Sequence, residues 1–247
     1  MSMFTALLAG SPELGLELER GQAALTGGMS RLTVVCIIRD RCFVESRQTR
    51  TVISLVDGAP HFVYGTYSPT ELSDIEGGTL GLSKKMPGGV VHRIDFLEPL
   101  RRGQAHTFSF WERVPESKQE MLADQDFSGQ TFESPTLRYQ VEVHFLGEQP
   151  AVIWGYDKLL RIERPREPDG GILLQSSEGR VSAEFADLYG GLCAGVAWRW
   201  LPFVRVARRN PRPTLDAQGD HRELKTIKVQ GRHRDFKRLV DHRGSVD

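Results

Sequence analysis

The amino-acid sequence predicts an all-β protein, an antiparallel β-sandwich of immunoglobulin-like or Greek-key type. Hydrophobic and polar residues alternate over residues 181–186 and again over 192–200, and the pair Gly190-Gly191 separates the two runs. This period of two is typical of strands rather than helices. A related glycine corner lies at residues 95–103. It begins with an acidic residue, Asp95, as Glu184 precedes the corner at Gly190-Gly191. About ten or eleven short strands with such corners indicate either one two-layered unit or two tandem, duplicated modules.

The first quarter of the chain contains several strand signals. Residues 13–20 alternate leucine with glycine or glutamate, which favours a strand with one solvated face, although Ser11-Pro12-Glu13 would also suit a helix start. Residues 32–38 are nearly all apolar and predict a buried strand. Residues 43–55 predict a long strand, in whose polar middle we expect a bend or bulge. The turn signal Asp57-Gly58 follows and predicts a hairpin.

The middle of the chain combines strands with two long polar stretches. Residues 68–89 are rich in glycine and predict an irregular loop, a feature that is often functional when it is this long. Strands are expected at 90–97 and 107–114, on either side of the first corner. Residues 115–136 form the second polar stretch, which we interpret as the boundary between two modules.

The last folded part begins with the most regular pattern in the chain. Residues 137–146 place five hydrophobic side chains on one parity and polar side chains on the other, which predicts a half-exposed antiparallel strand. Short strands are expected at 152–156, 159–163 and 172–175, before the glycine corner within 181–200.

These boundaries predict a first β module at residues 1–115, a second at 137–204 and a basic tail or arm at 205–247. Lysine plus arginine equals aspartate plus glutamate, at 32 each, which excludes a global attraction to nucleic acid or to membranes. The charge is uneven, however. The tail carries 12 basic and 6 acidic residues, whereas residues 1–204 carry 20 basic and 26 acidic residues.

Cysteine usage predicts a reduced, cytoplasmic protein. Cys36, Cys42 and Cys193 are odd in number and widely spaced. The first ten residues lack the basic start of a signal peptide. No apolar run approaches the roughly 18 residues that a membrane span needs, and we expect no membrane partner.

Four stretches of the chain carry a family resemblance. They read P-L-R-R-G-Q-A-H at 99–106, Y-Q-V-E-V-H-F at 139–145, P-A-V-I-W at 150–154 and F-A-D-L-Y-G-G-L-C-A-G-V-A-W-R-W at 185–200. The region resembles the β-rich part that follows a helix-turn-helix domain in some actinobacterial regulators. The resemblance implies a bacterial, regulatory protein with a sensing or partner-binding role. Its motifs are architectural rather than catalytic.

The search for catalytic motifs is mostly negative. The sequence contains no phosphate-binding G-x-x-x-x-G-K-[ST], no H-E-x-x-H and no G-x-S-x-G. His92, Asp95 and His106 could bind a metal or transfer a proton, but a regular strand places His92 and Asp95 on opposite faces. Solvated histidines are the simpler interpretation, and a structural thiol is the simpler interpretation of Cys193. We therefore predict no cofactor and no metal, and the catalytic residues, if any, are unknown.

Two regions are candidates for partner binding. Arg199 lies between Trp198 and Trp200 and could stack a ligand, although core tryptophans beside a sheet-capping arginine are the alternative. The tail mixes basic with sparse apolar residues, which suits a nucleic-acid arm, a segment that docks on an acidic partner, or a solvated tail. Its candidate contact residues are Leu224, Ile227, Arg232, Arg234, Phe236, Lys237 and Arg238.

The sequence as a whole predicts a cytoplasmic, non-catalytic β-sandwich binding protein. Its partner is expected to be a protein or a small ligand, and its role regulatory. Two alternatives stay open: an enzyme with a site near His92, Asp95 and His106, and a nucleic-acid binder that uses the basic tail.

Overall fold

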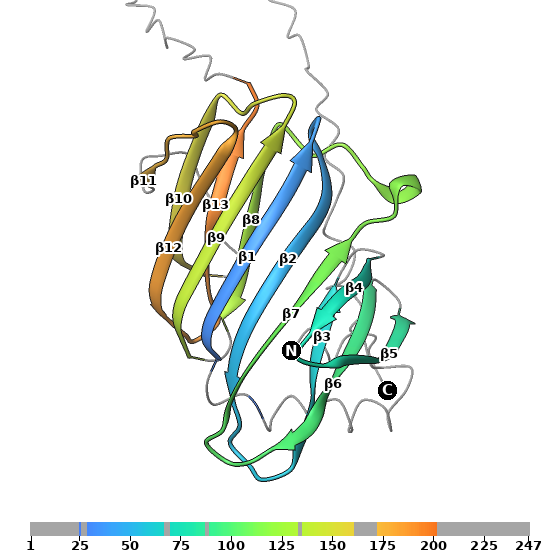
Figure 1. Cartoon of the computed structure of the whole chain (residues 1–247). Helices are drawn as coiled ribbons and strands as arrows, with labels where there is room; N and C mark the ends of the chain where they lie inside the picture. Colours follow the sequence, from blue (N-terminus) through green and yellow to red (C-terminus); the bar gives the residue numbers. More distant parts are fainter. Residues whose placement is uncertain are drawn as a thin grey trace, which may run out of the picture. The chain divides into compact units, whose positions relative to one another are not determined.

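The computed structural model describes residues 25, 29–66, 70–86, 89–132, 135–160 and 172–201. Strands dominate these ranges, which confirms the predicted all-β class (Figure 1). A short 3-10 turn, η1 (Glu116–Lys118), lies between the seventh and eighth strands. The strands are β1 (Met29–Arg39), β2 (Cys42–Ile53), β3 (Ala59–Thr66), β4 (Glu71–Glu76), β5 (Thr79–Met86), β6 (Gly89–Leu100), β7 (Ala105–Arg113), β8 (Gln125–Phe132), β9 (Thr136–Leu146), β10 (Val152–Leu160), β11 (Ile172–Leu173), β12 (Arg180–Leu188) and β13 (Leu192–Arg199).

The described strands form three sheets. A six-stranded sheet has the order β12-β9-β1-β2-β7-β4, a four-stranded sheet the order β11-β10-β13-β8, and a three-stranded sheet the order β3-β6-β5. Neighbouring strands in these sheets are antiparallel, with the exception of β1 and β9, which pair in parallel. The antiparallel sheets agree with the predicted sandwich class.

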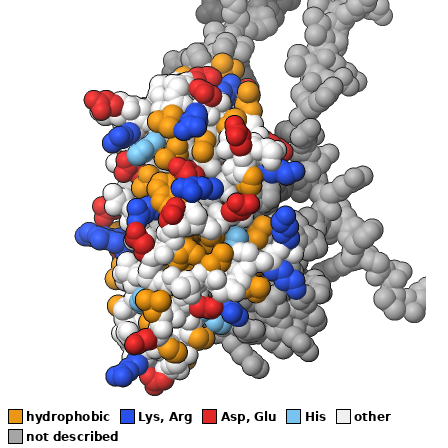
Figure 2. Space-filling model, turned by 45° about the vertical axis from the view of Figure 1, so that its right-hand side comes forward, with side chains coloured by type: hydrophobic (Ala, Val, Ile, Leu, Met, Phe, Trp, Pro, Cys, Tyr) orange, Lys and Arg blue, Asp and Glu red, His pale blue; other side chains and the backbone are white. Residues whose placement is uncertain are grey.

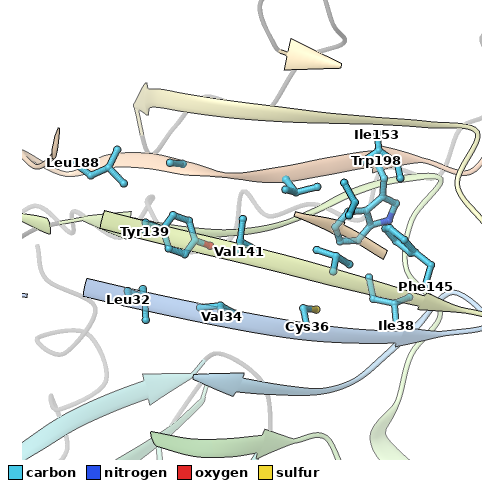
Figure 3. Close-up of a cluster of buried hydrophobic side chains, with 14 of the residues drawn as sticks. Leu32, Val34, Cys36, Ile38, Tyr139, Val141, Phe145, Ile153, Leu188 and Trp198 are labelled. Carbon is cyan, nitrogen blue, oxygen red and sulfur yellow. The ribbon is translucent and has the colours of Figure 1, made fainter. Parts of the chain in front are cut away.

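One face of the six-stranded sheet carries two hydrophobic cores. Inward residues of β12, β9 and β1 pack with residues of β8, β10 and β13, and this cluster is called the first core. Inward residues of β2 and β7 pack with β3 and β6 in the second core. In the first core, Leu32, Val34, Cys36 and Ile38 line β1 beside Tyr139, Val141 and Phe145 of β9 (Figure 3). The two smaller sheets thus cover different parts of the same large sheet.

The tight corners carry the chain from one sheet to another. The predicted corners exist: Gly103 (φ 78°) lies between β6 and β7, and Gly190 and Gly191 (φ 68° and 78°) lie between β12 and β13. The turn predicted at Asp57-Gly58 also forms, but the predicted hairpin is wrong, because β2 pairs with β1 and β7 whereas β3 pairs with β6. A turn signal specifies a reversal of the chain, not the sheet that the next strand joins. Here β2 and β3 face each other across the second core, where Val52 of β2 packs with Ala59 and Phe62 of β3.

Both stretches predicted as long polar loops contain strands. Residues 68–89 include β4 and β5, and residues 115–136 include β8. Each of these strands lies at the end of its sheet. An edge strand buries little and often carries charged residues, so its composition resembles that of a loop.

The later strands follow the predicted pattern with two corrections. Strand β9 alternates buried and exposed side chains as predicted, but it lies inside the sheet, between β12 and the parallel strand β1. Its first predicted core residue, Leu137, is 63% exposed, whereas the preceding Thr136 is buried. The strands predicted at 152–156 and 159–163 are a single strand, β10, up to Leu160, with an irregular register between Tyr156 and Leu159.

The two predicted modules contribute strands to a single sheet. Strands β1, β2, β4 and β7 come from residues 1–115, and β9 and β12 from 137–204. The basic tail lies outside the described residues, and so does the strand expected at 13–20. Within the described ranges, no helix is both long and apolar enough to cross a bilayer.

Candidate functional site

A network of buried polar side chains lies between the six-stranded and three-stranded sheets. Ser46, Gln48 and Arg50 come from alternate positions of β2, Tyr64 from β3 and Glu112 from β7. All but Tyr64 are at least nine-tenths buried. The period of two in β2 turns the three polar side chains inward, on the same face as the apolar side chains of β1.

Glu112 is the acceptor at the centre of this network. Its Oε2 atom accepts hydrogen bonds from the Tyr64 hydroxyl (2.6 Å), the Gln48 amide (3.2 Å) and the Ser46 hydroxyl (3.3 Å). The Gln48 amide oxygen in turn accepts from Arg50 Nη2 at 2.7 Å and Nε at 3.2 Å. The guanidinium also lies 5.2 Å from the centre of the Phe62 ring. The Gln48 amide therefore links a buried cation to a buried anion.

Burial dominates the protonation of these groups. It raises the pKa of the Glu112 carboxyl, although hydrogen bonds from Tyr64, Ser46, Thr70 and Gln48 oppose it. It also lowers the pKa of the Arg50 guanidinium, and it raises that of the Tyr64 phenol well above its usual value. Perturbed groups of this kind occur at functional sites and in structural networks alike. Here the named groups are bonded to one another, and the arrangement ties β2, β3 and β7 together.

The histidines and the carboxylate of the predicted enzyme site do not converge. His92 points into the second core, where its Nδ1 atom lies 2.8 Å from the Ser83 hydroxyl. Asp95 lies on the other face of β6, as predicted, and pairs with Arg93 Nε at 2.9 Å. His106 donates from Nε2 to the Gly77 carbonyl at 2.6 Å. His92 is buried rather than solvated, because it shares one face of β6 with the core residues Ile94 and Phe96.

His92 has an unusual environment. Burial lowers its pKa to about 4, so its imidazole is neutral at pH 7. Its Nε2 atom has no hydrogen-bond partner among the described residues. An orphaned acceptor costs less than an orphaned N–H, so we assign the proton to Nδ1, which donates to Ser83. In this tautomer His92 does not activate the serine hydroxyl.

The described residues contain no group of three or more histidine, cysteine or acidic side chains that could hold a metal ion. All three thiols are free. Burial raises the pKa of Cys36 to about 12, which keeps it protonated. Cys193 lies 3.0 Å from the Thr131 hydroxyl, in mid-strand. Neither environment resembles that of an activated nucleophile.

Trp198 and Trp200 belong to the first core, at 2% and 4% exposure. Arg199 points to the opposite face of β13 and donates to the Gln125 amide oxygen at 2.8 Å. The stacked arrangement suggested by the sequence does not form, because neighbouring side chains of a strand alternate between its faces. Trp200 is instead covered by Arg41, whose guanidinium carbon lies 5.3 Å from the ring centre. The other candidate residues, from Leu224 to Arg238, lie outside the described residues.

Sequence reasoning missed an exposed feature where two corners meet. Residues 54–58 connect β2 to β3, residues 101–104 connect β6 to β7, and together they are called the corner pair. The Ser54 N–H donates to the Gln104 carbonyl (3.0 Å), and the Gly103 N–H donates to the Ser54 carbonyl (2.7 Å). The corner pair exposes Leu55 (41%), Val56 (45%), Arg101 and Arg102. The turn signals were visible in the sequence, but nothing in it showed that the two turns would touch.

Charged side chains of both signs lie on one face of the molecule (Figure 2). On the face shown in Figure 2, acidic and basic side chains lie interspersed with hydrophobic ones. Ion pairs such as Arg47–Glu76 (3.0 Å) and Arg113–Glu45 (2.7 Å) cross the strands of the six-stranded sheet.

Comparisons with known proteins identify no family. No protein-family model and no curated protein matches the chain. Among solved structures, the chain is similar to the M1 zinc metallopeptidase from Deinococcus radiodurans, with a TM-score of 0.42 and 12% identity over 69% of this chain and 41% of that chain. A mutant of that peptidase bound to a Tyr-Ser-Ala substrate matches with a TM-score of 0.43 and 11% identity, over 72% of this chain and 45% of that chain. The chain therefore spans less than half the length of these structures, and so distant a likeness carries no functional conclusion.

Proposed function

We propose that this chain is a non-catalytic β-sandwich binding protein that recognises a protein partner through the corner pair. The observation that carries the proposal is the combination of exposed aliphatic and arginine side chains on a backbone whose hydrogen bonds are made internally. In addition to the two bonds between the corners, the Gly58 N–H donates to the Leu100 carbonyl at 2.9 Å. The Arg102 N–H donates to Asp57 Oδ1 at 3.0 Å, and the Arg101 N–H donates to the Gln104 side chain at 2.9 Å.

Internal hydrogen bonding matters because an interface removes water. A loop with unpaired N–H groups would lose hydrogen bonds on binding, at a cost of roughly 1–3 kcal/mol for each orphaned group. The corner pair avoids this cost for the donors named above. The hydrogen bonds between the two corners also hold each corner in place, so little conformational entropy is lost when the corner pair binds.

The side chains indicate the kind of partner. Leu55 and Val56 offer exposed apolar surface, and no ion pair joins Arg101 or Arg102 to a described residue. Arginine is enriched at protein interfaces, where its planar group pairs with carboxylates. A projecting corner fits a protein surface, whereas a small ligand needs a concave site. A protein with an apolar recess beside acidic groups is therefore the expected partner.

Two finer points belong to the same proposal. The free thiols suit a cytoplasmic setting. The resemblance of the central region to actinobacterial regulators suits a regulatory role in a bacterium. The enzyme and nucleic-acid alternatives stay hypotheses. The first rests on dispersed groups around His92, and the second rests on a tail that lies outside the described residues.

Site-specific photo-crosslinking tests the proposal. A photoreactive phenylalanine analogue replaces Val56 in the corner pair, and in a matched control it replaces Thr49, on the outer face of the six-stranded sheet. We expect a discrete cross-linked product from cells at position 56 and none at position 49. The product should disappear when Leu55→Ser and Arg101→Gln are added. Equal labelling at both positions, or none at position 56, would contradict the proposal.

A further inference from the structure

Among the described strands, β12 forms one edge of the six-stranded sheet. Strand β12 is the last strand in the sheet order and pairs only with β9 among the described strands. The Phe145 N–H of β9 donates to the Gly179 carbonyl at 2.7 Å, directly before β12. In an antiparallel pair the backbone groups alternate in direction, so those of residues 181, 183 and 185 face β9. The N–H and C=O groups of Ser182, Glu184 and Ala186 therefore face away from the sheet.

This edge lacks the protection that other edges of the fold have. Edge strands are commonly guarded by lysines, prolines or bulges. Strand β5 has Lys84 and Lys85 and a register shift, and β4 is short and irregular, with a positive φ at Asp74. The pairing of β12 with β9 runs without a break from Arg180 to Ala186. At one end, Ser177 accepts the Arg180 N–H and donates to its carbonyl, both at 2.9 Å.

Exposed apolar residues lie on the same side of the molecule. Strand β11, which pairs with β10 in the four-stranded sheet, exposes Ile172 (75%) and Leu173 (63%). The side chains of Leu174 and Phe185 both come within 3.7 Å of the position that a side chain at Gly155 would occupy, so the β11 segment and β12 are adjacent. An unpaired strand beside two exposed aliphatic side chains is typical of a protein interface.

We propose that two copies of this chain pair through β12, antiparallel about a twofold axis at Ala183. In this register Ser182 of each copy lies opposite Glu184 of the second copy, and the outward backbone groups of both residues bond across the axis. On the inner face, Val181 lies opposite Phe185 of the second copy, so each core gains an apolar contact. The result is one continuous twelve-stranded sheet, with the self-complementary interface that twofold symmetry requires.

The neighbouring registers are disfavoured by the same residues. A register centred on Glu184 places this residue opposite Glu184 of the second copy, and directly opposed like charges are destabilising. A register centred on Ser182 places Arg180 opposite Glu184 of the second copy, but the backbone of Arg180 already bonds to Ser177. The register centred on Ala183 opposes no like charges, and its cross-axis bonds end at the two pairs of Ser182 with Glu184, because Ser177 already bonds the backbone of Arg180 opposite Ala186 of the second copy.

A cysteine at the axis tests both the pairing and its register. Ala183 and its copy form a pair without mutual hydrogen bonds, in which Cα atoms approach to about 4.5 Å, within the range of a disulfide. Ala183→Cys should form a covalent dimer under mild oxidation, whereas Ser182→Cys and the wild type, with its three native thiols, should not. A Ser182→Cys dimer in place of the Ala183→Cys dimer would overturn this register.

A second variant tests the backbone contacts without new thiols. Glu184→Pro removes an outward N–H and leaves the ladder to β9 intact, since edge strands tolerate proline at such positions. We expect loss of the dimer in light scattering for Glu184→Pro, but not for Glu184→Ala, which keeps the N–H. A monomeric wild type at concentrations up to about 100 μM, a range that includes weak dimers, would overturn the proposal.

Discussion

The first and second cores lie on the same face of one sheet but differ in chemistry, and the border runs between β1 and β2. Leu32, Val34 and Cys36 on β1 pair directly with Arg50, Gln48 and Ser46 on β2. The first three side chains belong to an apolar core, and the other three belong to the network around Glu112. One sheet can therefore bury apolar and polar side chains on adjacent strands, provided that the polar side chains bond to one another.

The two cores therefore depend on different interactions. The first core is stabilised by the burial of apolar surface and by close packing, which tolerate changes of pH. The second core adds titratable groups whose net contribution is the balance between desolvation and hydrogen bonding. The difference predicts opposite responses to substitution and to pH.

The largest effect is expected from Glu112→Leu. The variant leaves Arg50 buried without its linked anion, and removal of one member of a buried charged pair costs about 3–5 kcal/mol of unfolding free energy. The double variant Arg50→Met/Glu112→Leu should lose less, because no buried charge is left uncompensated. Denaturant unfolding measures both. As a control, Glu45→Ala, in an exposed pair with Arg113, should cost roughly 0–1 kcal/mol. Equal losses for the single and double variants would show that the two charges are independent.

The matching change in the first core is Leu32→Ala. Leu32 is completely buried, and removal of such a side chain costs about 2–5 kcal/mol through lost burial and the cavity left behind. Leu137→Ala is the control, because Leu137 is mostly exposed and its loss should stay within about 0.5 kcal/mol. The cost at Leu32 should be the same at pH 5 and pH 8. A cost that varies with pH would mean that the first core also depends on charge.

His92 should make the second core sensitive to acid. Its pKa is about 4 in the folded chain and 6.5 ordinarily, so the unfolded chain binds the proton more readily. Stability is fully present above pH 6.5 and is lost as the pH falls through about 4. Each tenfold difference in proton affinity is worth about 1.4 kcal/mol, so the loss reaches about 3 kcal/mol. His92→Leu should flatten the profile between pH 7 and 4, measured by denaturant unfolding. His144→Gln, on the outer face of β9, should leave the profile steep, and an identical slope in the His92 variant would contradict this assignment.

How much the sequence predicted follows from the range of the interactions involved. Alternation within a strand and the corners at Gly103 and Gly190-Gly191 depend on residues close in the chain, and these predictions agree with the structure. The parallel pairing of β1 with β9 joins segments far apart in the chain, and no local pattern encodes it. The same holds for the contact between the corners.

The polar network shows a second limit. The polar middle of β2 predicted a bend there, but the pairing with β1 is regular from Glu45 to Thr51, and the register shift lies earlier, between Phe43 and Glu45. The inward residues Ser46, Gln48 and Arg50 nevertheless continue the strand, because Glu112 and Tyr64 satisfy them from β7 and β3. A buried polar face and a solvated one have the same sequence pattern. Only the partner strands tell them apart.

The smallest expected effect concerns the strands that cover the two cores. Lys158 of β10, in the sheet over the first core, has a φ of 56°, in the left-handed region. That conformation costs a residue other than glycine roughly 1–2 kcal/mol, whereas glycine adds about 0.4–1 kcal/mol of unfolded-state entropy. The first figure is the larger, so Lys158→Gly should stabilise the chain by about 0.5–1 kcal/mol. The contact of Lys158 with Asp157, at 3.8 Å on the surface, contributes little to the balance.

Lys85→Gly in β5, over the second core, relieves no left-handed residue and should instead destabilise by about 0.5–1 kcal/mol. Thermal unfolding measured on both variants should therefore shift in opposite directions, and a shift in the same direction would show that the kink in β10 is not strained.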